Sequence, residues 1–294
     1  MPKSFADRLT ALVEERRSQV CLGLDPDPAQ LSAAGTSDSS ASPAERAADA
    51  IAADCRRLIA SAGGACVAVK PQLACFERLG APGWAALAEV CGAAGEAGLL
   101  VVADGKRGDV PVSAAAYAQA LVGVTSTPWG DVPGLGVDAF TVNPLLGVDA
   151  LEPLVAAAEA SGAGVFALVR TSNPGAADVE DLETAEGPVH ERLAGIVDGL
   201  AGRLLGECGL SGMGAVVGTT APEHIARLRA LMPRSVFLMP GVGAQGGRPE
   251  LLGAAFAAGP SSAIVAASRG IAAADDPAAA AEKLREEVWR VATE

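Results

Sequence analysis

The sequence predicts an α/β fold in which eight parallel strands close into a barrel, each followed by a helix. Half of the 294 residues are hydrophobic, which is enough for a large core. Short apolar runs rich in β-branched residues alternate with alanine-rich helical stretches along the whole chain. The apolar runs are continuous rather than alternating with polar residues, which is typical of parallel strands buried on both faces. A (β/α)8 TIM barrel therefore fits this pattern better than an open, doubly wound sheet.

The elements follow in order along the chain. An amphipathic helix is expected over 4–18, with Ser4 as its cap and Phe5 and Leu9 at helical spacing. The barrel strands are expected at 20–24, 65–70, 99–103, 137–142, 164–170, 214–218, 235–239 and 262–267. Their helices are expected near 43–61, 83–97, 111–122, 148–161, 185–209, 222–231, 247–258 and 276–292.

Two loops interrupt this alternation. Residues 32–43, rich in Ser, Gly, Ala and Pro, are expected to form a flexible insertion, and 124–136 a second loop rich in Gly and Pro. Neither loop is long enough to link two domains, so 1–294 is expected to be a single TIM-barrel domain.

Composition excludes several classes of protein. The chain carries 22 Lys and Arg against 35 Asp and Glu, a net charge of −13. It has only ten aromatic residues and no cluster of basic residues, which argues against a nucleic-acid partner. No run of about 18 uncharged apolar residues is present, so no membrane span or membrane partner is expected.

The cysteines and histidines suggest neither a disulfide framework nor a metal site. The six cysteines contain no C-x-x-C pair, which favours reduced thiols in a cytoplasmic protein. The two histidines, His190 and His224, lie in polar helical stretches and are expected at the surface. The start of the chain is charged and amphipathic, unlike a signal peptide.

Polar residues follow most of the predicted strands, at the end of a barrel where such folds build their sites. Each alone could be a helix cap or a loop charge, but together they predict a ring-shaped site. These residues are Asp25, Lys70, 104–109, Asn143, 170–173, 240–247 and 268–270.

The segment 241–247, G-V-G-A-Q-G-G, follows the seventh strand and predicts a phosphate site. Glycines such as Gly241 and Gly243 let backbone N–H groups approach an anion closely. Gln245 can donate one more hydrogen bond, and Arg269, after the eighth strand, can pair with a phosphate in bidentate fashion.

The motif Asp104-x-Lys106-x-x-Asp109 follows the third strand, and Lys70 ends the neighbouring one. Adjacent carboxylates keep ammonium groups charged, so these lysines are poor nucleophiles or Schiff-base formers. A fixed positive charge with an available proton instead suits the stabilisation and protonation of a developing carbanion.

These segments resemble the orotidine 5′-phosphate decarboxylase family, specifically its longer-chain bacterial branch, the type 2 subfamily. The matching stretches, in the family's order over nearly the whole chain, are LGLDPDP (22–28), VAVKPQLACFERLG (67–80), ADGKRGDVPVSAAAYA (103–118), DAFTVNPLLG (138–147), LVRTSNPGA (168–176), MPGVGAQGG (239–247) and ASRGI (267–271). The D-x-K-R-x-D segment is highly specific, whereas the phosphate loops are shared more widely among barrels. Gly105, where Ala is commoner, and Ser113, where Thr is frequent, are departures that keep the chemistry.

The resemblance implies a conversion of orotidine 5′-phosphate to uridine 5′-phosphate and CO2 without a metal or organic cofactor. It places Asp104 beside the substrate carboxylate, and Lys106 at C6 as carbanion stabiliser and proton donor. Lys70 would orient Asp104 and contact the ribose. Asp109, with Ser113 beside it, would reach into the partner's site, so a homodimer with shared sites is implied.

The resemblance also implies which residues bind the rest of the substrate. Asp25 would hydrogen-bond a ribose hydroxyl, and Ser172 the pyrimidine edge. Gln245 and Arg269 would hold the phosphate. Asn143, Gly241 and Gly243 complete the expected binding set.

Two alternatives stay open at this level. A related sugar-phosphate decarboxylase, such as 3-keto-gulonate 6-phosphate decarboxylase, would need magnesium and a carboxylate-rich site. An inactive nucleotide-monophosphate binder would have no need to desolvate four charged groups, Lys70, Asp104, Lys106 and Asp109.

Overall fold

The computed structural model describes residues 2–30 and 40–294. Within them, eight parallel strands form a closed barrel in the order β1-β12-β11-β10-β7-β6-β3-β2. The barrel strands are β1 (Val20–Leu24), β2 (Ala68–Pro71), β3 (Leu100–Arg107), β6 (Ala139–Val142), β7 (Gly164–Arg170), β10 (Ser211–Val217), β11 (Ser235–Pro240) and β12 (Ala263–Ala267). The predicted (β/α)8 barrel is thereby confirmed, and each barrel strand overlaps its predicted range.

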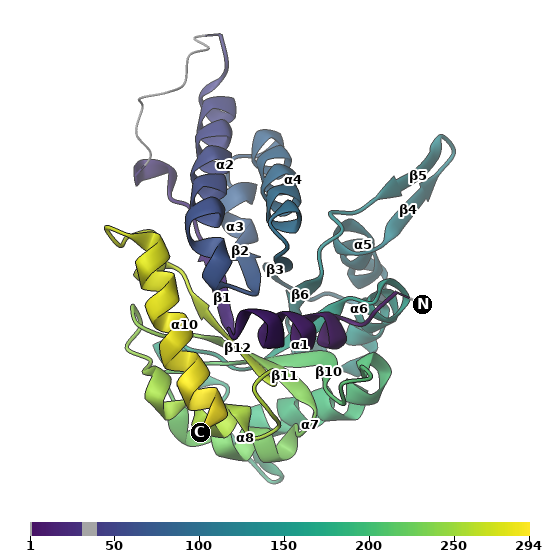
Figure 1. Cartoon of the computed structure of the whole chain (residues 1–294). Coiled ribbons are helices and arrows are strands. Elements are labelled where there is room, and N and C mark those ends of the chain that lie inside the picture. Colours follow the sequence, from purple (N-terminus) through teal and green to yellow (C-terminus); the bar gives the residue numbers. More distant parts are fainter. Residues whose placement is uncertain (1, 31–39) are drawn as a thin grey trace.

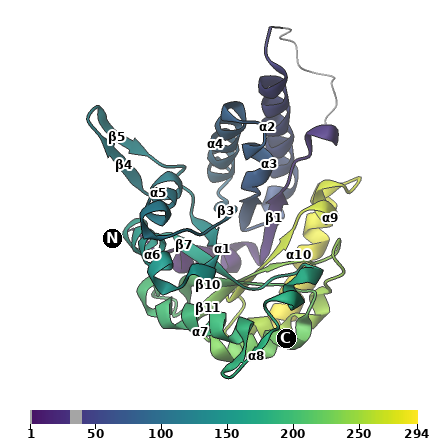
Figure 2. The same ribbon diagram turned by 180° about the vertical axis from the view of Figure 1, so that it is seen from behind.

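Helices surround this sheet on its outer face (Figures 1 and 2). The α-helices are α1 (Phe5–Arg16), α2 (Pro43–Ala62), α3 (Leu73–Glu77), α4 (Ala81–Glu96), α5 (Pro111–Leu121), α6 (Val148–Ser161), α7 (Val189–Ala201), α8 (Ile225–Leu231), α9 (Arg269–Ala272) and α10 (Pro277–Thr293). Short 3-10 turns are Pro28–Gln30, Gly63–Ala65, Pro144–Leu146, Pro174–Asp178, Gly202–Leu204, Pro222–His224, Pro249–Leu251 and Gly253–Phe256. None of the helices in the described ranges is both long and apolar enough to cross a membrane.

Helix α1 closes one end of the barrel, across which it lies in Figure 1. Ser4 caps it as predicted, accepting a hydrogen bond from the Asp7 N–H. Arg8 pairs with Asp138 just before β6, and Arg16 donates to the Cys66 carbonyl at 2.7 Å just before β2. These contacts all lie where strands begin, so only the end where strands finish stays open.

Two apolar layers hold the barrel together. The inner layer combines α1 residues such as Phe5 with inward-facing strand residues such as Phe166, whose rings meet edge to face at 5.7 Å. The outer layer joins the sheet to the surrounding helices. Because the interior is filled from the α1 end, a ligand can enter only at the carboxyl ends of the strands.

Three segments differ from the predicted elements. The loop at 124–136 contains a hairpin, β4 (Val124–Thr127) with β5 (Gly130–Pro133), which projects away from the barrel in both ribbon views (Figures 1 and 2). The helix predicted at 185–209 begins only at Val189, because a second hairpin, β8 (Glu183–Thr184) with β9 (Gly187–Pro188), precedes it. The helix predicted at 247–258 is instead two 3-10 turns, since Pro249 and Gly253 disfavour a continuous helix.

Two further expectations concern local features. The predicted insertion at 32–43 lies mostly outside the described residues, and Ser42 and Pro43 form the capped start of α2. The prediction of a surface position for His190 is wrong: it is 3% exposed. Its ring packs on His224, with the ring centroids 4.6 Å apart, under the segment that carries Glu180 and Asp181.

The six cysteines all lie in described segments and are free, as their spacing predicts. Burial raises the pKa of the thiols of Cys21, Cys55, Cys66 and Cys91 to about 12. These four thiols therefore behave as small apolar core groups rather than as nucleophiles.

Candidate active site

A cavity of about 430 Å³ lies at the open end of the barrel. Most barrel strands, or the loops that follow them, contribute to its wall. Its lining includes predicted residues from both ends of the sequence: Asp25, Lys70, Asp104, Lys106, Ser172, Gly241, Gln245 and Arg269. Most of the residues predicted to form a ring-shaped site therefore lie around one cavity of a single chain.

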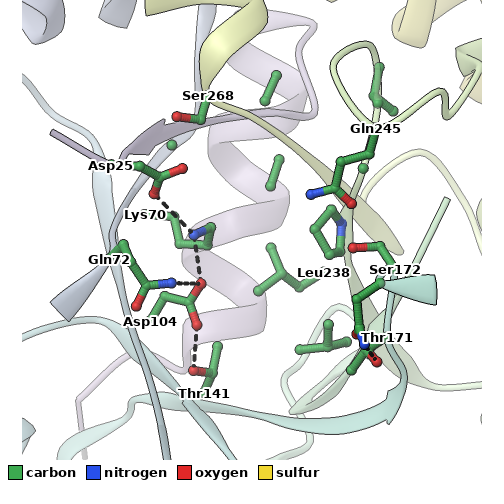
Figure 3. A pocket seen from close by; sticks show the side chains of 18 of the residues that line it. Asp25, Lys70, Gln72, Asp104, Thr141, Thr171, Ser172, Leu238, Gln245 and Ser268 are labelled. Carbon is green, nitrogen blue, oxygen red and sulfur yellow. Dashed lines mark hydrogen bonds and ion pairs between the residues drawn. The ribbon is translucent and has the colours of Figure 1, made fainter. Parts of the chain in front are cut away.

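Asp104 lies beside Lys70 on one side of the cavity (Figure 3), and its carboxylate also binds Lys106. Lys70 Nζ is 2.6 Å from its Oδ2, and Lys106 Nζ is 2.7 Å from its Oδ1. Asp25 lies on the far side of Lys70, with its Oδ1 3.9 Å from the ammonium nitrogen. The chain thus holds a row of alternating charges, carboxylate, ammonium, carboxylate and ammonium, along one wall.

Burial and neighbouring charges shift the pKa values of Asp104 and Lys70 in opposite directions. Burial disfavours the Asp104 carboxylate, but the Lys70 and Lys106 ammonium groups outweigh it and hold the pKa of Asp104 well below its ordinary value. Burial likewise favours a neutral Lys70, yet Asp104 and Asp25 outweigh it and raise the pKa of Lys70. Asp104 and Lys70 are consequently charged at neutral pH, as the sequence predicts for a site that does not use a neutral amine.

Two residues that the sequence reasoning missed complete the surroundings of Asp104. Gln72 Nε2 donates to Oδ2 at 3.2 Å, and Thr141 Oγ1 donates to Oδ1 at 2.9 Å. The sequence contains a feature that could have identified each of them. Gln72 follows Lys70 by two positions, which is the spacing of one strand face, and Thr141 is a hydroxyl within a fully buried apolar strand.

The opposite wall carries the glycine-rich loop after β11. Gly241 and Gly243 have φ values of 115° and 74°, which disfavour any other residue. A Cβ at Gly247 would lie 2.0 Å from Thr219 Oγ1, so the loop packs its backbone directly on the neighbouring segment. Gln245 projects from this loop toward the cavity (Figure 3).

The loop after β7 brings Ser172 to the same wall as Gln245 (Figure 3). Arg170, at the end of β7, is buried and binds both oxygens of Asp181 at 2.7 and 2.8 Å. The Glu180 carboxylate accepts from the backbone N–H of Thr171 at 2.7 Å. These bonds tie the loop to its own strand and thereby position Ser172.

Four predicted residues are absent from the described residues that line this cavity. They are Asp109, Ser113, Asn143 and Gly243. Asp109 Oδ1 accepts from the Val110 N–H at 2.7 Å, and Asn143 Oδ1 accepts from the Leu145 N–H at 3.0 Å. In one chain, Asn143 caps a turn rather than forming part of the wall.

The fold and this site define a (β/α)8-barrel enzyme whose polar groups gather at the carboxyl ends of the strands. Residues 18–284 match the family described as Orotidine 5'-phosphate decarboxylase / HUMPS family, and the chain belongs to it.

Individual relatives extend over most of the chain. It is similar to orotidine 5'-phosphate decarboxylase of Rhodopirellula baltica, with 40% identity over 91% of this chain and 88% of that protein. The protein of that name from Deinococcus radiodurans is 41% identical over 92% and 90% of the two chains. Among solved structures, OMP decarboxylase of Leishmania donovani matches with a TM-score of 0.76 and 35% identity, covering 99% and 100% of the chains.

Proposed function

We propose that this chain is a carboxy-lyase that converts orotidine 5′-phosphate to uridine 5′-phosphate and CO2, the last step of de novo pyrimidine synthesis. The observation that carries the proposal is Asp104, ion-paired to Lys70 and Lys106 in a cavity whose other wall is the glycine-rich loop. A substrate with an anion at each end fits a cavity with lysine ammonium groups on one wall and Gln245 with the glycine-rich loop on the other.

Binding holds the ring against the charged row. Gln245, Arg269 and the Gly241 loop bind the phosphate, and Ser172 hydrogen-bonds the pyrimidine edge. Asp25 and Lys70 bind the ribose. The phosphate is remote from the reacting carbon, so its binding energy can orient the ring and assemble the loops around it.

Chemistry takes place beside Asp104 and Lys106. The bond between C6 and the carboxylate carbon breaks, CO2 leaves, and the electron pair stays on C6. The Lys106 ammonium stabilises this carbanion and then transfers a proton from Nζ to C6, which yields uridine 5′-phosphate. Electrostatic stabilisation is the largest contribution, because the ammonium is positioned and charged before the reaction begins. Asp104 supports that charge at 2.7 Å.

The active unit is proposed to be a homodimer in which Asp109 and Ser113 act in the partner's site. Support comes from apolar side chains exposed beside them, which monomeric proteins rarely gather in one place. These are Val110 and Val112 next to Asp109, together with Leu145 and Leu146 in the turn before α6 and Val148 at the start of that helix. The proposal further includes one domain over the whole chain, and a cytoplasmic location consistent with the free thiols.

The magnesium-dependent sugar-phosphate decarboxylase is the second candidate, because the family that matches is a joint one. The donor set favours the first candidate. Both oxygens of Asp104 are taken by ammonium groups, and no three His, Cys, Asp or Glu side chains in the described segments are grouped to hold a metal ion. Ser172 also has no purpose toward a sugar phosphate that lacks a pyrimidine.

The direct test is to mix purified protein with orotidine 5′-phosphate in excess EDTA and follow the pyrimidine absorbance. Conversion to uridine 5′-phosphate is expected. Activity that appears only with magnesium, and only on a sugar phosphate, would support the second candidate. Tight binding of uridine 5′-phosphate without turnover of either substrate would support an inactive binder.

The shared site has its own test, which uses two inactive variants. Asp109→Ala and Lys106→Ala chains are mixed so that heterodimers form, and one site of each heterodimer then carries neither lesion. Activity should return on mixing, toward about a quarter of the wild-type value per chain at random exchange. If heterodimers are shown to form and activity stays absent, Asp109 does not act across the interface.

A further inference from the structure

The pairing between β3 and β6 is interrupted at the charged row. Val102 pairs with Ala139 and Ala103 with Phe140, but the next pair is Arg107 with Val142. Three residues of β3, 104–106, therefore face a single residue of β6, Thr141. Such an irregularity leaves backbone groups without ladder partners, and it re-aims the side chains of the bulged strand.

Lys106 takes an unusual backbone conformation within this bulge. Its φ is 47°, in the left-handed region that residues with a Cβ rarely occupy. In the described part of the chain only Arg17, at the end of α1, is another non-glycine residue with positive φ. Strained residues of this kind persist only where surrounding contacts hold them.

Thr141 supplies the contact that holds Lys106. The Lys106 backbone N–H donates to Thr141 Oγ1 at 2.8 Å, in place of the strand partner that the bulge removes. Since an N–H can only donate, the hydroxyl must accept this bond, and its own proton is free for another acceptor. That acceptor is Asp104 Oδ1, at 2.9 Å.

One buried hydroxyl thus connects the two ends of the bulge. Thr141 is 1% exposed, so water does not compete for either bond. The oxygen that it contacts, Asp104 Oδ1, is also the oxygen that binds Lys106 Nζ at 2.7 Å. Thr141 Oγ1 therefore contacts both the backbone N–H of Lys106 and the carboxylate oxygen that binds the Lys106 ammonium.

We propose that Thr141 is a positioning residue, which aims the Lys106 ammonium by holding its left-handed backbone and the Asp104 carboxylate together. The proposal rests on the proposed function, in which Lys106 protonates C6. Thr141 itself does not carry the proton. Its contribution is to reduce the movement of Lys106 relative to the bound ring, which matters most in the transition state.

The test compares Thr141→Val with Thr141→Ser. Valine keeps the shape and removes the oxygen, whereas serine keeps the oxygen and removes a methyl group. Thr141→Val should lower kcat by about tenfold to a hundredfold, the range for one hydrogen bond to a charged group. KM and the affinity for uridine 5′-phosphate should change less than about threefold, and Thr141→Ser should keep kcat within about threefold of wild type.

A purely structural role would give a different result. In that case Thr141→Val would lower the melting temperature and the amount of folded enzyme, without a fall in kcat at a nearly constant KM. Thr141→Ser would then not restore kcat. Thermal melts of both variants are therefore recorded, and Thr141→Ala replaces Thr141→Val if the valine variant does not fold. A kcat for the hydroxyl-free variant within twofold of wild type would overturn the proposal.

The wild-type assay separates this proposal from the proposed function. If wild-type protein does not convert orotidine 5′-phosphate, the function fails, and the positioning role is judged from a crystal structure of Thr141→Val. Loss of the left-handed conformation of Lys106, or movement of its ammonium away from Asp104, would support the role. An unchanged Lys106 in that structure would refute it.

Discussion

Replacing Asp104 with asparagine tests whether the charged row is held together as described. Asp104→Asn keeps the size of the side chain but only one acceptor oxygen, so it retains one of the two bonds from Gln72 and Thr141, and it removes the negative charge between the two lysines. Among the described residues, Lys70 then keeps only Asp25 as a counter-ion, at 3.9 Å. A buried ammonium without a close carboxylate is one of the most destabilising single changes in a protein.

The expected loss of stability in Asp104→Asn depends on how exposed each of the two lysines is. The Lys106 side chain is 43% exposed, so water replaces the lost carboxylate and the change contributes little. The Lys70 side chain is only 9% exposed. Removing one partner of a buried pair costs about 3–5 kcal/mol. Because Asp25 still offsets part of the Lys70 charge, we expect a loss at the lower end of this range, about 3 kcal/mol. For a chain of this length that corresponds to a fall in Tm of about 6 °C.

The dependence on pH has an opposite sign in the two proteins. In wild type the pKa of Lys70 is raised in the folded state. Its contribution to stability is therefore fully present below about pH 10.4, the ordinary pKa of lysine, and is lost only as the pH rises through the higher pKa of the folded state. Without Asp104, burial is expected to outweigh the remaining attraction of Asp25 and to lower the pKa of Lys70 below its unfolded value of about 10.4. The stability of Asp104→Asn relative to wild type should therefore increase from pH 7 toward pH 10.

Thermal unfolding followed by circular dichroism at pH 7 and pH 9.5 is the assay. The matched control is the double variant Asp104→Asn/Lys70→Met, which removes the stranded charge as well and should recover more than half of the lost Tm. A single variant that melts within about 1 °C of wild type would refute the reasoning, and so would a double variant less stable than the single one.

Three further predictions concern other parts of the molecule. Lys106→Ala should lower kcat at least about a thousandfold while uridine 5′-phosphate still binds; near-normal turnover would exclude Lys106 as proton donor. Gly247→Ala should weaken uridine 5′-phosphate binding about tenfold or more by calorimetry, because its Cβ would lie 2.0 Å from Thr219 Oγ1; unchanged binding would contradict this packing. Arg229 is buried and donates to four backbone carbonyls. Arg229→Met should therefore lower the free energy of unfolding in urea by about 3 kcal/mol or more, whereas Arg227→Met, at an exposed position, should be nearly neutral. Equal effects of the two substitutions would contradict a structural role for Arg229.

Local sequence patterns predict most of the barrel because a strand buried on both faces is a continuous apolar run. The hairpin at 124–133 escaped this reasoning, since its strand residues are almost all exposed and its turn resembles any loop with glycine. The helix at 185–209 was predicted too long because Gly187 and Pro188 were taken into it. His190 was misplaced, since helical periodicity does not reveal which loop folds back over a helix.

For the site, the motif around Asp104 and Lys106 identified the charged chemistry from the sequence, because charges directly after a buried strand have few structural uses. Order along the chain also placed Ser172 and Gln245 at the same end of the barrel. What a linear pattern cannot express is distance between strands. The Lys70 and Asp104 contact, the bulge that turns Lys106 into a left-handed conformation, and the Thr141 hydroxyl beneath it exist only once β2, β3 and β6 are side by side. Pairing of neighbouring strands decides these contacts, because it brings residues 30 to 40 positions apart within hydrogen-bonding distance.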